Sequence, residues 1–527
     1  MATLAQPMAL SGQSDEVYRH RYLIAFAVSL ASVLELVDTS IVNVAIPHMM
    51  GNLGATLEEV AWVSTGYIVA NVIVLPLTSF FADTFGRRNY YTGSVVLFTI
   101  ASFFCGNASS LESLVVWRIV QGIGGGALIS TAQSILYDVF PAEERGTGQA
   151  IFGMSIMVGP TIGPTLGGWI TDNYSWPWIF YINLPLGVLA AMLTWRYVPE
   201  PSIKTVRRGG MDWLGLALLI VGIGALQVLL ERGESKGWFD SNEITVLTAL
   251  AVLGLVGFVW HELRTAHPIV DLRVLRSRQL AIGVIFSSVM GFALYSSVFA
   301  LPVFMQTILH YDAWETGKAI FPGAVGSAIM MALMGRLSGK VDPRLLITLG
   351  VGLFSLSMWM HSHFTAQVGH DDLWWPLLIR GVGLGCIFVP LTGIAVEQLA
   401  PKDIPQGAGL FNLTRQLGGS FGIAITATLL SRFTEQSREA LRTHVALSEA
   451  PTRTVLDALT QRMAQLGGSL DAAQLKAAAM LDQMVRAQAA SIAFEKIFFV
   501  MGVVFACALP LLLLIKPGPG TKPTDVQ

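Results

Sequence analysis

The sequence predicts an all-helical integral membrane protein with fourteen membrane-spanning helices. Hydrophobic residues make up 53% of the 527 residues and charged residues only 13%, and the mean hydropathy is +0.59. Apolar stretches long enough to cross a bilayer, which takes about 20 residues, recur along the whole chain. This balance excludes a soluble globular protein.

The predicted spans form a first set of eight and a second set of six. The first set covers residues 23–47, 60–82, 90–108, 113–137, 148–171, 178–198, 212–231 and 243–263. The second set covers residues 280–309, 317–339, 345–364, 374–399, 406–431 and 494–515. Each stretch has the length and the apolar composition of a transmembrane helix.

The distribution of Lys and Arg predicts that both ends of the chain, residues 1–22 and 516–527, are cytoplasmic. With the N-terminus inside, most of these cations fall in cytoplasmic segments. The short outer loops then carry only Arg232 and Lys236, with Lys318 at the rim of a span. An excess of Lys and Arg marks the cytoplasmic loops of membrane proteins.

The chain repeats three local patterns, each time eight spans apart. Span 4 carries Arg118 before a run of glycines, and span 12 carries Arg380 before another. The turns after spans 2 and 10 and the first residues of spans 5 and 13 also match. We therefore predict two related six-helix bundles, residues 23–198 and 280–515, with two inserted helices in residues 199–279. Parallel repeats around a midplane site are typical of secondary transporters.

Glu35 and Asp38 lie near the middle of the first predicted span. A charged side chain at that depth costs roughly 2.5–3.5 kcal/mol on insertion scales, and residues three apart share one face of a helix. Close like charges and a low dielectric both favour a protonated carboxyl, so the pair is predicted to bind and release a proton. The alternative for Asp38 is a purely structural ion pair with a neighbouring Arg, and the participation of Glu35 is left open.

Arg118 lies within the fourth predicted span and therefore needs a partner. One hypothesis is that it stabilises the charged form of a nearby acid in one conformation and releases that acid in another. The alternative is a static ion pair.

The turn after the second span contains Asp83, Gly86, Arg87 and Arg88. Gly86 permits a tight turn, and the two arginines can pair with an acid of a neighbouring helix at the inner surface. Such a pair would act as a latch between two conformations. Both arginines also serve as positive charges that orient the chain in the membrane.

The fifth span carries the most specific pattern, which consists of Gly159, Gly163 and Gly167, with Pro160 and Pro164 following the first two glycines. Glycines four residues apart on one face allow two helices to approach closely. The prolines are expected to kink the helix and to free backbone carbonyls.

These segments resemble the fourteen-span drug:proton antiporter family of the major facilitator superfamily, the EmrB type, over nearly the whole chain. The resemblance implies that the first-span acid, here Asp38, couples to protons and that the fourth-span arginine, here Arg118, helps to pass the proton. The glycine pattern of the fifth span resembles the antiporter motif of drug exporters and implies export. The turn at Asp83 departs from the superfamily pattern at Ser79 and Thr84, which predicts a weaker latch.

Residues 432–493 form the one large hydrophilic segment between two predicted spans, on the outer side. Apolar residues recur at alternating spacings of three and four before Gly467-Gly468, at Leu456, Leu459, Met463, Leu466 and Leu470. This pattern predicts a helical hairpin with an apolar seam, whose second helix covers about 471–488. The hairpin either folds on itself or on the membrane surface, or docks to a periplasmic partner. The family resemblance implies a membrane fusion protein and an outer-membrane channel as partners.

Candidate substrate-lining residues are chosen by their position in the spans: Asn43, Gln121, Phe292, Tyr295, Phe299, Asn412 and Gln416. An apolar, aromatic cavity with few polar anchors suits bulky hydrophobic compounds, although an aromatic stripe more often serves helix packing.

The sequence thus predicts a proton-driven exporter of hydrophobic drug-like or toxic compounds in a bacterial inner membrane. No cofactor, metal, nucleic acid or enzymatic site is expected, because two glycine-rich segments lack the context of nucleotide-binding motifs. One alternative is a dedicated exporter of one metabolite, such as a fatty acid or a siderophore. The other is a membrane sensor that transports nothing.

Overall fold

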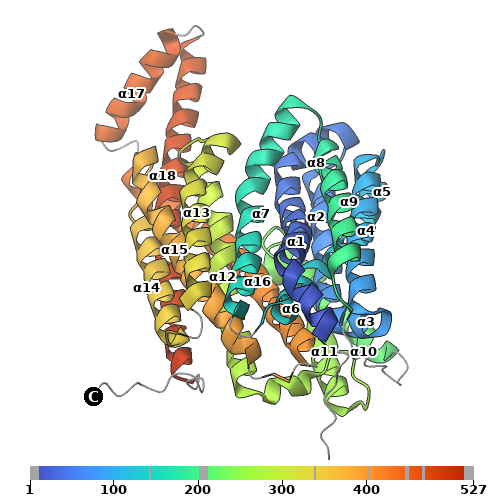
Figure 1. The fold of residues 1–527 in the computed structure, drawn as a ribbon. Coiled ribbons are helices and arrows are strands. Elements are labelled where there is room, and N and C mark those ends of the chain that lie inside the picture. The colour runs from blue at the N-terminus through green and yellow to red at the C-terminus, as the bar shows by residue number, and fades with distance from the viewer. Residues whose placement is uncertain are drawn as a thin grey trace, which may run out of the picture.

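A computed structural model describes residues 11–141, 144–200, 212–337, 340–397, 399–400, 403–445, 450–465 and 469–514. Across these ranges every regular element is helical, and no strand occurs (Figure 1). Twelve candidate membrane spans among them are long and apolar enough to cross a membrane. The chain is therefore an all-helical, multi-pass membrane protein, as the sequence predicts.

The N-terminal helices form one packed group in which α1 contacts α6, α7 and α9 and α2 contacts α5. Their bounds are α1 (Ser11–Leu53), α2 (Leu57–Val74), α3 (Thr78–Phe85), α4 (Arg87–Gly106), α5 (Leu111–Gly125), α6 (Leu128–Val139), α7 (Arg145–Asn173), α8 (Trp178–Tyr181) and α9 (Asn183–Tyr197). A short 3-10 helix, Leu75–Leu77, separates α2 from α3 within the second predicted span. It contains Pro76, whose ring nitrogen cannot donate the hydrogen bond that an uninterrupted α-helix needs.

Two further helices, α10 (Trp213–Arg232) and α11 (Asn242–Arg264), pack against each other, and α10 also packs against α2. The C-terminal helices follow as α12 (Arg278–Thr307), α13 (Ala313–Leu337), α14 (Pro343–His361), α15 (His370–Glu397), α16 (Ile404–His444), α17 (Ala450–Gln465) and α18 (Leu470–Ala506). Within this group α12 packs against α16, and α15 packs against α13 and α14.

In the segment predicted as an outer hairpin, α17 and α18 pack against each other, but the helix ends differ from the prediction. Helix α16 continues to His444, and the last span belongs to the same helix as the predicted second hairpin helix, because α18 begins at Leu470. Leu456, Leu459 and Met463 are half-buried as a seam requires, but Leu470 is 63% exposed, and Leu466, Gly467 and Gly468 lie outside the described residues. Polar residues with high helix propensity continue a helix beyond its apolar part, so hydropathy alone misplaces its end.

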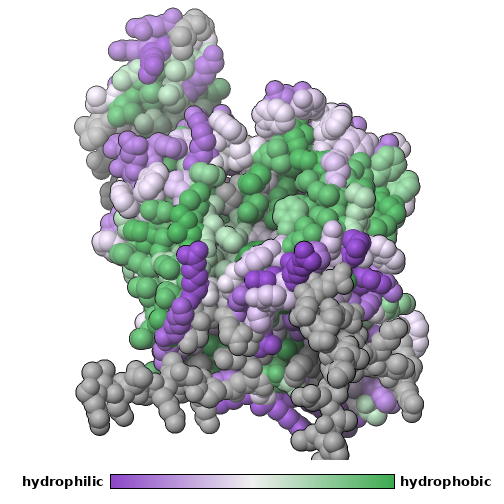
Figure 2. Space-filling view, in the orientation of Figure 1, coloured by the Kyte–Doolittle hydropathy of each residue, from purple (hydrophilic) through white to green (hydrophobic). Residues whose placement is uncertain are grey.

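The surface separates into a hydrophobic belt and hydrophilic ends. In Figure 2 hydrophobic side chains cover the middle of the helices, and hydrophilic side chains gather on α17 and on the outer part of α18. Figure 1 shows α17 and the outer part of α18 projecting beyond the other helices. A belt of this kind is what the lipid hydrocarbon requires of a membrane protein.

Helix α7 joins the two groups of helices, because it packs against α1 on one side and α13 on the other. A methyl group added to Gly335 of α13 would lie 2.7 Å from the carbonyl oxygen of Gly146 on α7. Gly317, at the other end of α13, lies against Thr165. The two groups therefore touch along the length of these helices.

Candidate proton and substrate site

Asp38 lies on α1 and is completely buried. Its Oδ2 accepts a hydrogen bond from Arg118 Nη1 at 2.5 Å. Its Oδ1 accepts hydrogen bonds from Gln121 Nε2 at 2.9 Å and from Asn183 Nδ2 at 2.7 Å. Donors from α5 and α9 thus converge on one acid of α1, and both carboxylate oxygens are satisfied as acceptors.

Arg118 is fixed by further contacts around the same acid. Its Nε donates to the Val63 carbonyl at 3.1 Å, and its guanidinium lies 4.2 Å from the centre of the Tyr67 ring. Only 1% of its side chain is exposed. The ion pair of Arg118 and Asp38 is therefore fully desolvated, and its energetic value depends on these additional partners.

Glu35, one turn earlier on α1, has a sparser environment. Its Oε1 accepts a hydrogen bond from Asn71 Nδ2 at 2.7 Å, whereas its buried Oε2 has no hydrogen-bond partner among the described residues. The buried Tyr67 hydroxyl also lacks a hydrogen-bond partner there. The two acids share a helix face but differ in the number of hydrogen bonds that they accept, since three side chains donate to Asp38 and one to Glu35.

The glycine run after Arg118 allows α2 and α4 to approach α5 closely. A methyl group at Gly126 would lie 2.6 Å from the Asn71 carbonyl on α2, and one at Gly124 would lie 2.8 Å from the Phe98 nitrogen on α4. Gly125 faces the Tyr67 hydroxyl in the same way. These glycines place Asn71 and Tyr67 beside the two acids.

The glycine pattern of α7 contacts the segment of α1 that carries the acids. A methyl group added at Gly159 would meet Leu36. One added at Gly163 would meet Ser40, and one at Gly167 would meet Ile41, both on the next turn of α1. Ser40 Oγ also donates to the Gly159 carbonyl at 3.0 Å. The close approach that the spacing predicts is present.

Helix α7 continues as one helix from Arg145 to Asn173 through both Gly-Pro steps, so neither proline ends it. Pro164 is half-buried, and the side chain of Pro160 lies outside the described residues. The helix tolerates the missing proline donor because α1 and α13 pack along it on both sides.

At the start of α4, Arg87 forms an ion pair with Asp138 of α6. Gly86 has the positive φ of +85° that the turn before α4 requires. Arg88 lies 5.1 Å from the centre of the Trp195 ring, and Asp83 is exposed on α3. Arg87 thus pairs with an acid on a neighbouring helix, as the sequence predicts.

The predicted lining residues fall into separate places. Asn43 is exposed and accepts a hydrogen bond from Ser64 Oγ at 3.2 Å. Gln121 is completely buried in the Asp38 network, so it does not line an open surface in this conformation. Phe292, Tyr295 and Phe299 are half-buried on α12.

Asn412 and Gln416, both on α16, bond to N-terminal helices. Asn412 Nδ2 donates to Gln133 Oε1, and Gln416 Nε2 donates to Asn71 Oδ1 at 3.4 Å. Asn71 also donates a hydrogen bond to Glu35. The bond from Gln416 to Asn71 therefore connects α16 to the acids of α1.

Sequence reasoning missed several residues of this region: Asn71, Gln133, Asn183 and Arg415. Arg415 is completely buried on α16; its Nη1 donates to Tyr295 Oη and its Nη2 to Asn412 Oδ1, both at 3.3 Å. An arginine within an apolar stretch is the same signal that identified Arg118, so Arg415 was detectable from the sequence. The neutral amides give no comparable signal.

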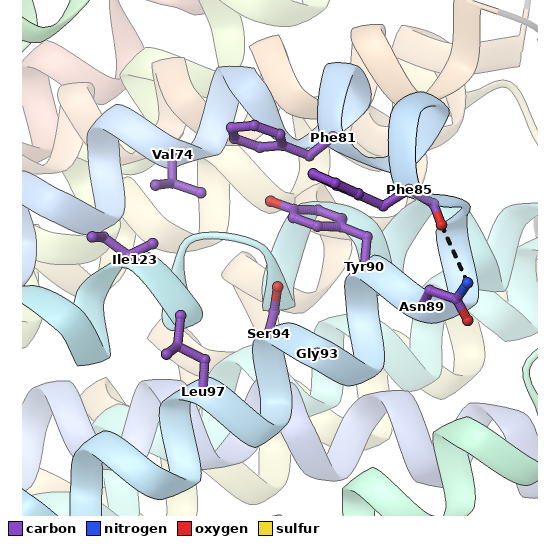
Figure 3. Close-up of a pocket in the computed structure, with 9 residues that line it drawn as sticks. All are labelled: Val74, Phe81, Phe85, Asn89, Tyr90, Gly93, Ser94, Leu97 and Ile123. Atoms are coloured by element: carbon purple, nitrogen blue, oxygen red, sulfur yellow. Dashed lines mark hydrogen bonds between the residues drawn. The ribbon is translucent and has the colours of Figure 1, made fainter. Parts of the chain in front are cut away.

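A separate pocket of about 510 Å³ lies between α2, α3, α4 and α5 (Figure 3). Its walls include Phe81, Phe85, Tyr90 and Ile123, and it contains none of the predicted site residues. Phe85 and Ile123 are exposed, so the pocket opens at the exposed surface of these helices and not toward the buried acids.

Comparison with known proteins agrees with this architecture. A family model described as Major Facilitator Superfamily matches residues 28–423. The structure of the proton:xylose symporter XylE has the same fold, with a TM-score of 0.62, 13% identity, and coverage of 96% of this chain and 98% of that chain. The chain therefore has the fold of the major facilitator superfamily.

Two relatives are similar over nearly their whole length. The multidrug export protein EmrB of Haemophilus influenzae is 34% identical over 503 residues, which cover 95% of this chain and 96% of the relative. The fatty acid resistance protein FarB of Neisseria gonorrhoeae is 36% identical over 497 residues, which cover 94% and 96%. The chain belongs to the major facilitator superfamily and, within it, to the EmrB-type multidrug:proton antiporters.

Proposed function

We propose that this protein exports hydrophobic drug-like or toxic compounds across a bacterial inner membrane, in exchange for protons and by alternating access. The observation that carries the proposal is the completely buried Asp38, which three donor side chains from α5 and α9 hold. Ionisable groups inside membrane helices mark ion pathways. A shift of either helix relative to α1 changes the number of donors and with it the proton affinity of the acid.

In this mechanism Asp38 binds the transported proton, and Arg118 modulates the proton affinity of Asp38. Glu35 is a second proton acceptor. The ion pair of Arg87 with Asp138 stabilises the closed inner side, and the close contact of α7 with α1 transmits movement to the acids. The proton gradient is the energy source, and no cofactor takes part.

For the architecture we propose fourteen spans, with α4 and α16 added to the twelve candidate spans. Both helices pack among the others, and they coincide with predicted spans 90–108 and 406–431. The proposed relation of the two bundles has a structural parallel, because Arg118 of α5 binds Asp38 of α1 and Arg380 of α15 binds Ser297 of α12. Both termini are then cytoplasmic.

Dedicated export of one fatty acid is the second candidate function, and the name of the relative FarB favours it. The two functions predict different sets of compounds that compete for transport. Inhibition of transport by many unrelated compounds supports multidrug export, whereas inhibition by fatty acids alone supports the dedicated exporter.

A periplasmic adaptor, such as a membrane fusion protein leading to an outer-membrane channel, is the proposed partner of the projecting α17 and α18. Leu475 and Met484 on α18 are 75% and 51% exposed, which provides apolar surface for such a contact. The variants Leu475→Glu and Met484→Glu should keep transport in vesicles but lose resistance in whole cells. Unchanged resistance of both variants would argue against docking at this surface.

The export function is tested with purified protein in liposomes, a fluorescent hydrophobic drug and an imposed pH gradient. Gradient-driven flux is expected in the parent and in Asp371→Asn, which removes an exposed acid, but not in Asp38→Asn. Flux that ignores the gradient, or that persists in Asp38→Asn, would overturn proton coupling at this site.

A further inference from the structure

We infer that Arg415 selects exported compounds that carry a carboxylate and anchors that group where α16 faces the N-terminal helices. The ligand class is an amphipathic organic acid, with an apolar body and one anionic end. The inference deepens the proposed export function and rests on it.

The first argument is the balance of buried charge. The charged side chains buried in the central part of the described helices are Glu35, Asp38, Arg118, Arg380 and Arg415. Arg87 and Glu262 are also buried, but they lie in the first turn of α4 and the last turn of α11. Two acids against three arginines leave a net charge of +1, or +2 when Glu35 is protonated. The interior therefore favours an anionic ligand over a cationic one in either state.

The second argument is the environment of Arg415 itself. Its two hydrogen-bond acceptors, Tyr295 Oη and Asn412 Oδ1, are neutral, and its buried Nε has no hydrogen-bond partner among the described residues. None of the ion pairs found within 4.0 Å in the described ranges involves Arg415. A buried guanidinium without an ion-pair partner at contact distance is costly, and its planar fork of donors matches a carboxylate.

The third argument is the position of Arg415 beside the proton site. The next residue, Gln416, donates to Asn71, which in turn donates to Glu35. A carboxylate bound to Arg415 would thus lie between the N-terminal and C-terminal helices, where alternating access has to place a substrate. The half-buried ring of Tyr295 offers an apolar wall for the body of the ligand.

Arg380, the other arginine without an acid, does not share this position. It donates from Nη1 to Ser297 Oγ at 3.1 Å. Ser297 is two residues from Tyr295, so the two side chains leave α12 in nearly opposite directions. Arg415 faces the N-terminal helices through its neighbours, whereas Arg380 packs within the C-terminal group.

Three probes with one apolar body test the inference: 11-(dansylamino)undecanoic acid, its methyl ester and its choline ester. They present an anion, a neutral group and a cation. Transport is measured in proteoliposomes under a pH gradient, and binding is measured by dansyl fluorescence in detergent, for the parent, Arg415→Gln, Arg415→Lys and the control Arg264→Gln. Arg264 is exposed at the end of α11, so its substitution removes the same charge far from the site.

We expect the parent to bind and export the acid about tenfold better than the choline ester, because charge-assisted hydrogen bonds carry that much selectivity. Arg415→Gln should weaken binding and export of the acid about tenfold and should change binding and export of the methyl ester by less than about twofold. Arg415→Lys should recover part of the preference, and Arg264→Gln should match the parent.

An equal loss for all three probes in Arg415→Gln, or a parent without preference for the acid, would overturn the inference while leaving the export function intact. Absence of gradient-driven transport of every probe in the parent would instead contradict the proposed function. Binding in detergent then still decides whether Arg415 holds the carboxylate. Size-exclusion chromatography of each variant identifies those that do not fold.

Discussion

Asp38 on α1 and Arg415 on α16 are both completely buried, but only Asp38 has a partner of opposite charge. Around Asp38, donors from two other helices satisfy both carboxylate oxygens. Around Arg415, two neutral oxygens at 3.3 Å are the acceptors, and one nitrogen has no hydrogen-bond partner in the described part of the chain.

The difference separates two tasks. A buried charge with all its partners is costly to break, so the Asp38 network changes only when whole helices move relative to one another. A buried charge with incomplete partners gains free energy when a ligand completes it. In the proposed mechanism the N-terminal helices bind a proton under conformational control, and the C-terminal helices bind the substrate.

The largest expected effect comes from Arg118→Met, which leaves Asp38 buried without its cation. We expect a loss of about 3–5 kcal/mol in the free energy of unfolding, measured by denaturation of the purified protein in detergent. The double variant Asp38→Asn/Arg118→Met should recover most of this loss, because no uncompensated charge is left. A double variant as unstable as the single one would show that packing, and not charge, determines the effect.

Gly163→Ala tests the contact between α7 and α1. The added methyl group would collide with Ser40, and overpacking of this kind costs about 1–3 kcal/mol. The control is Gly352→Ala on α14, where nothing lies within 4 Å of the added group and the helix should gain about 0.5–1 kcal/mol. Equal thermal stability of both variants would contradict the close packing.

Arg87→Gln removes the ion pair with Asp138, which the proposed orientation places at the inner surface. Asp138 is 37% exposed, so the stability effect should be at most about 1 kcal/mol. The transport rate should change more than the stability, because the pair joins the start of α4 to the end of α6 and opens in each cycle of the proposed mechanism. An unchanged rate in proteoliposomes would remove the latch from the mechanism.

Arg380→Met provides the smallest effect and the sharpest contrast with Arg118→Met. Arg380 donates to Ser297 and has no acid that would be left unpaired, so its replacement by an apolar side chain should change the free energy of unfolding by less than about 1 kcal/mol. A loss as large as that of Arg118→Met would show that Arg380 contributes as much to stability as Arg118 does, although no acid pairs with it.

Twelve of the fourteen predicted spans coincide with candidate spans of the described residues, because an apolar stretch of spanning length has few alternatives to a helix in lipid. It also identifies Asp38 and Arg118, since a charge in such a stretch is rare. It misplaces the helix ends around residues 432–493, where a polar helix continues the membrane helix. Asn71 and Asn183 are not predicted, because an amide in a span is too common to indicate a partner for an acid.

The most direct test of the central claim is proton release upon substrate binding, measured with a pH indicator on purified protein in weakly buffered detergent. Addition of a hydrophobic drug should release protons from the parent. Asp38→Asn should still bind the drug but release fewer protons, and the double variant Asp38→Asn/Glu35→Gln should release none. If Asp38→Asn releases as many protons as the parent, Asp38 is a structural acid, and the coupling has to be located elsewhere.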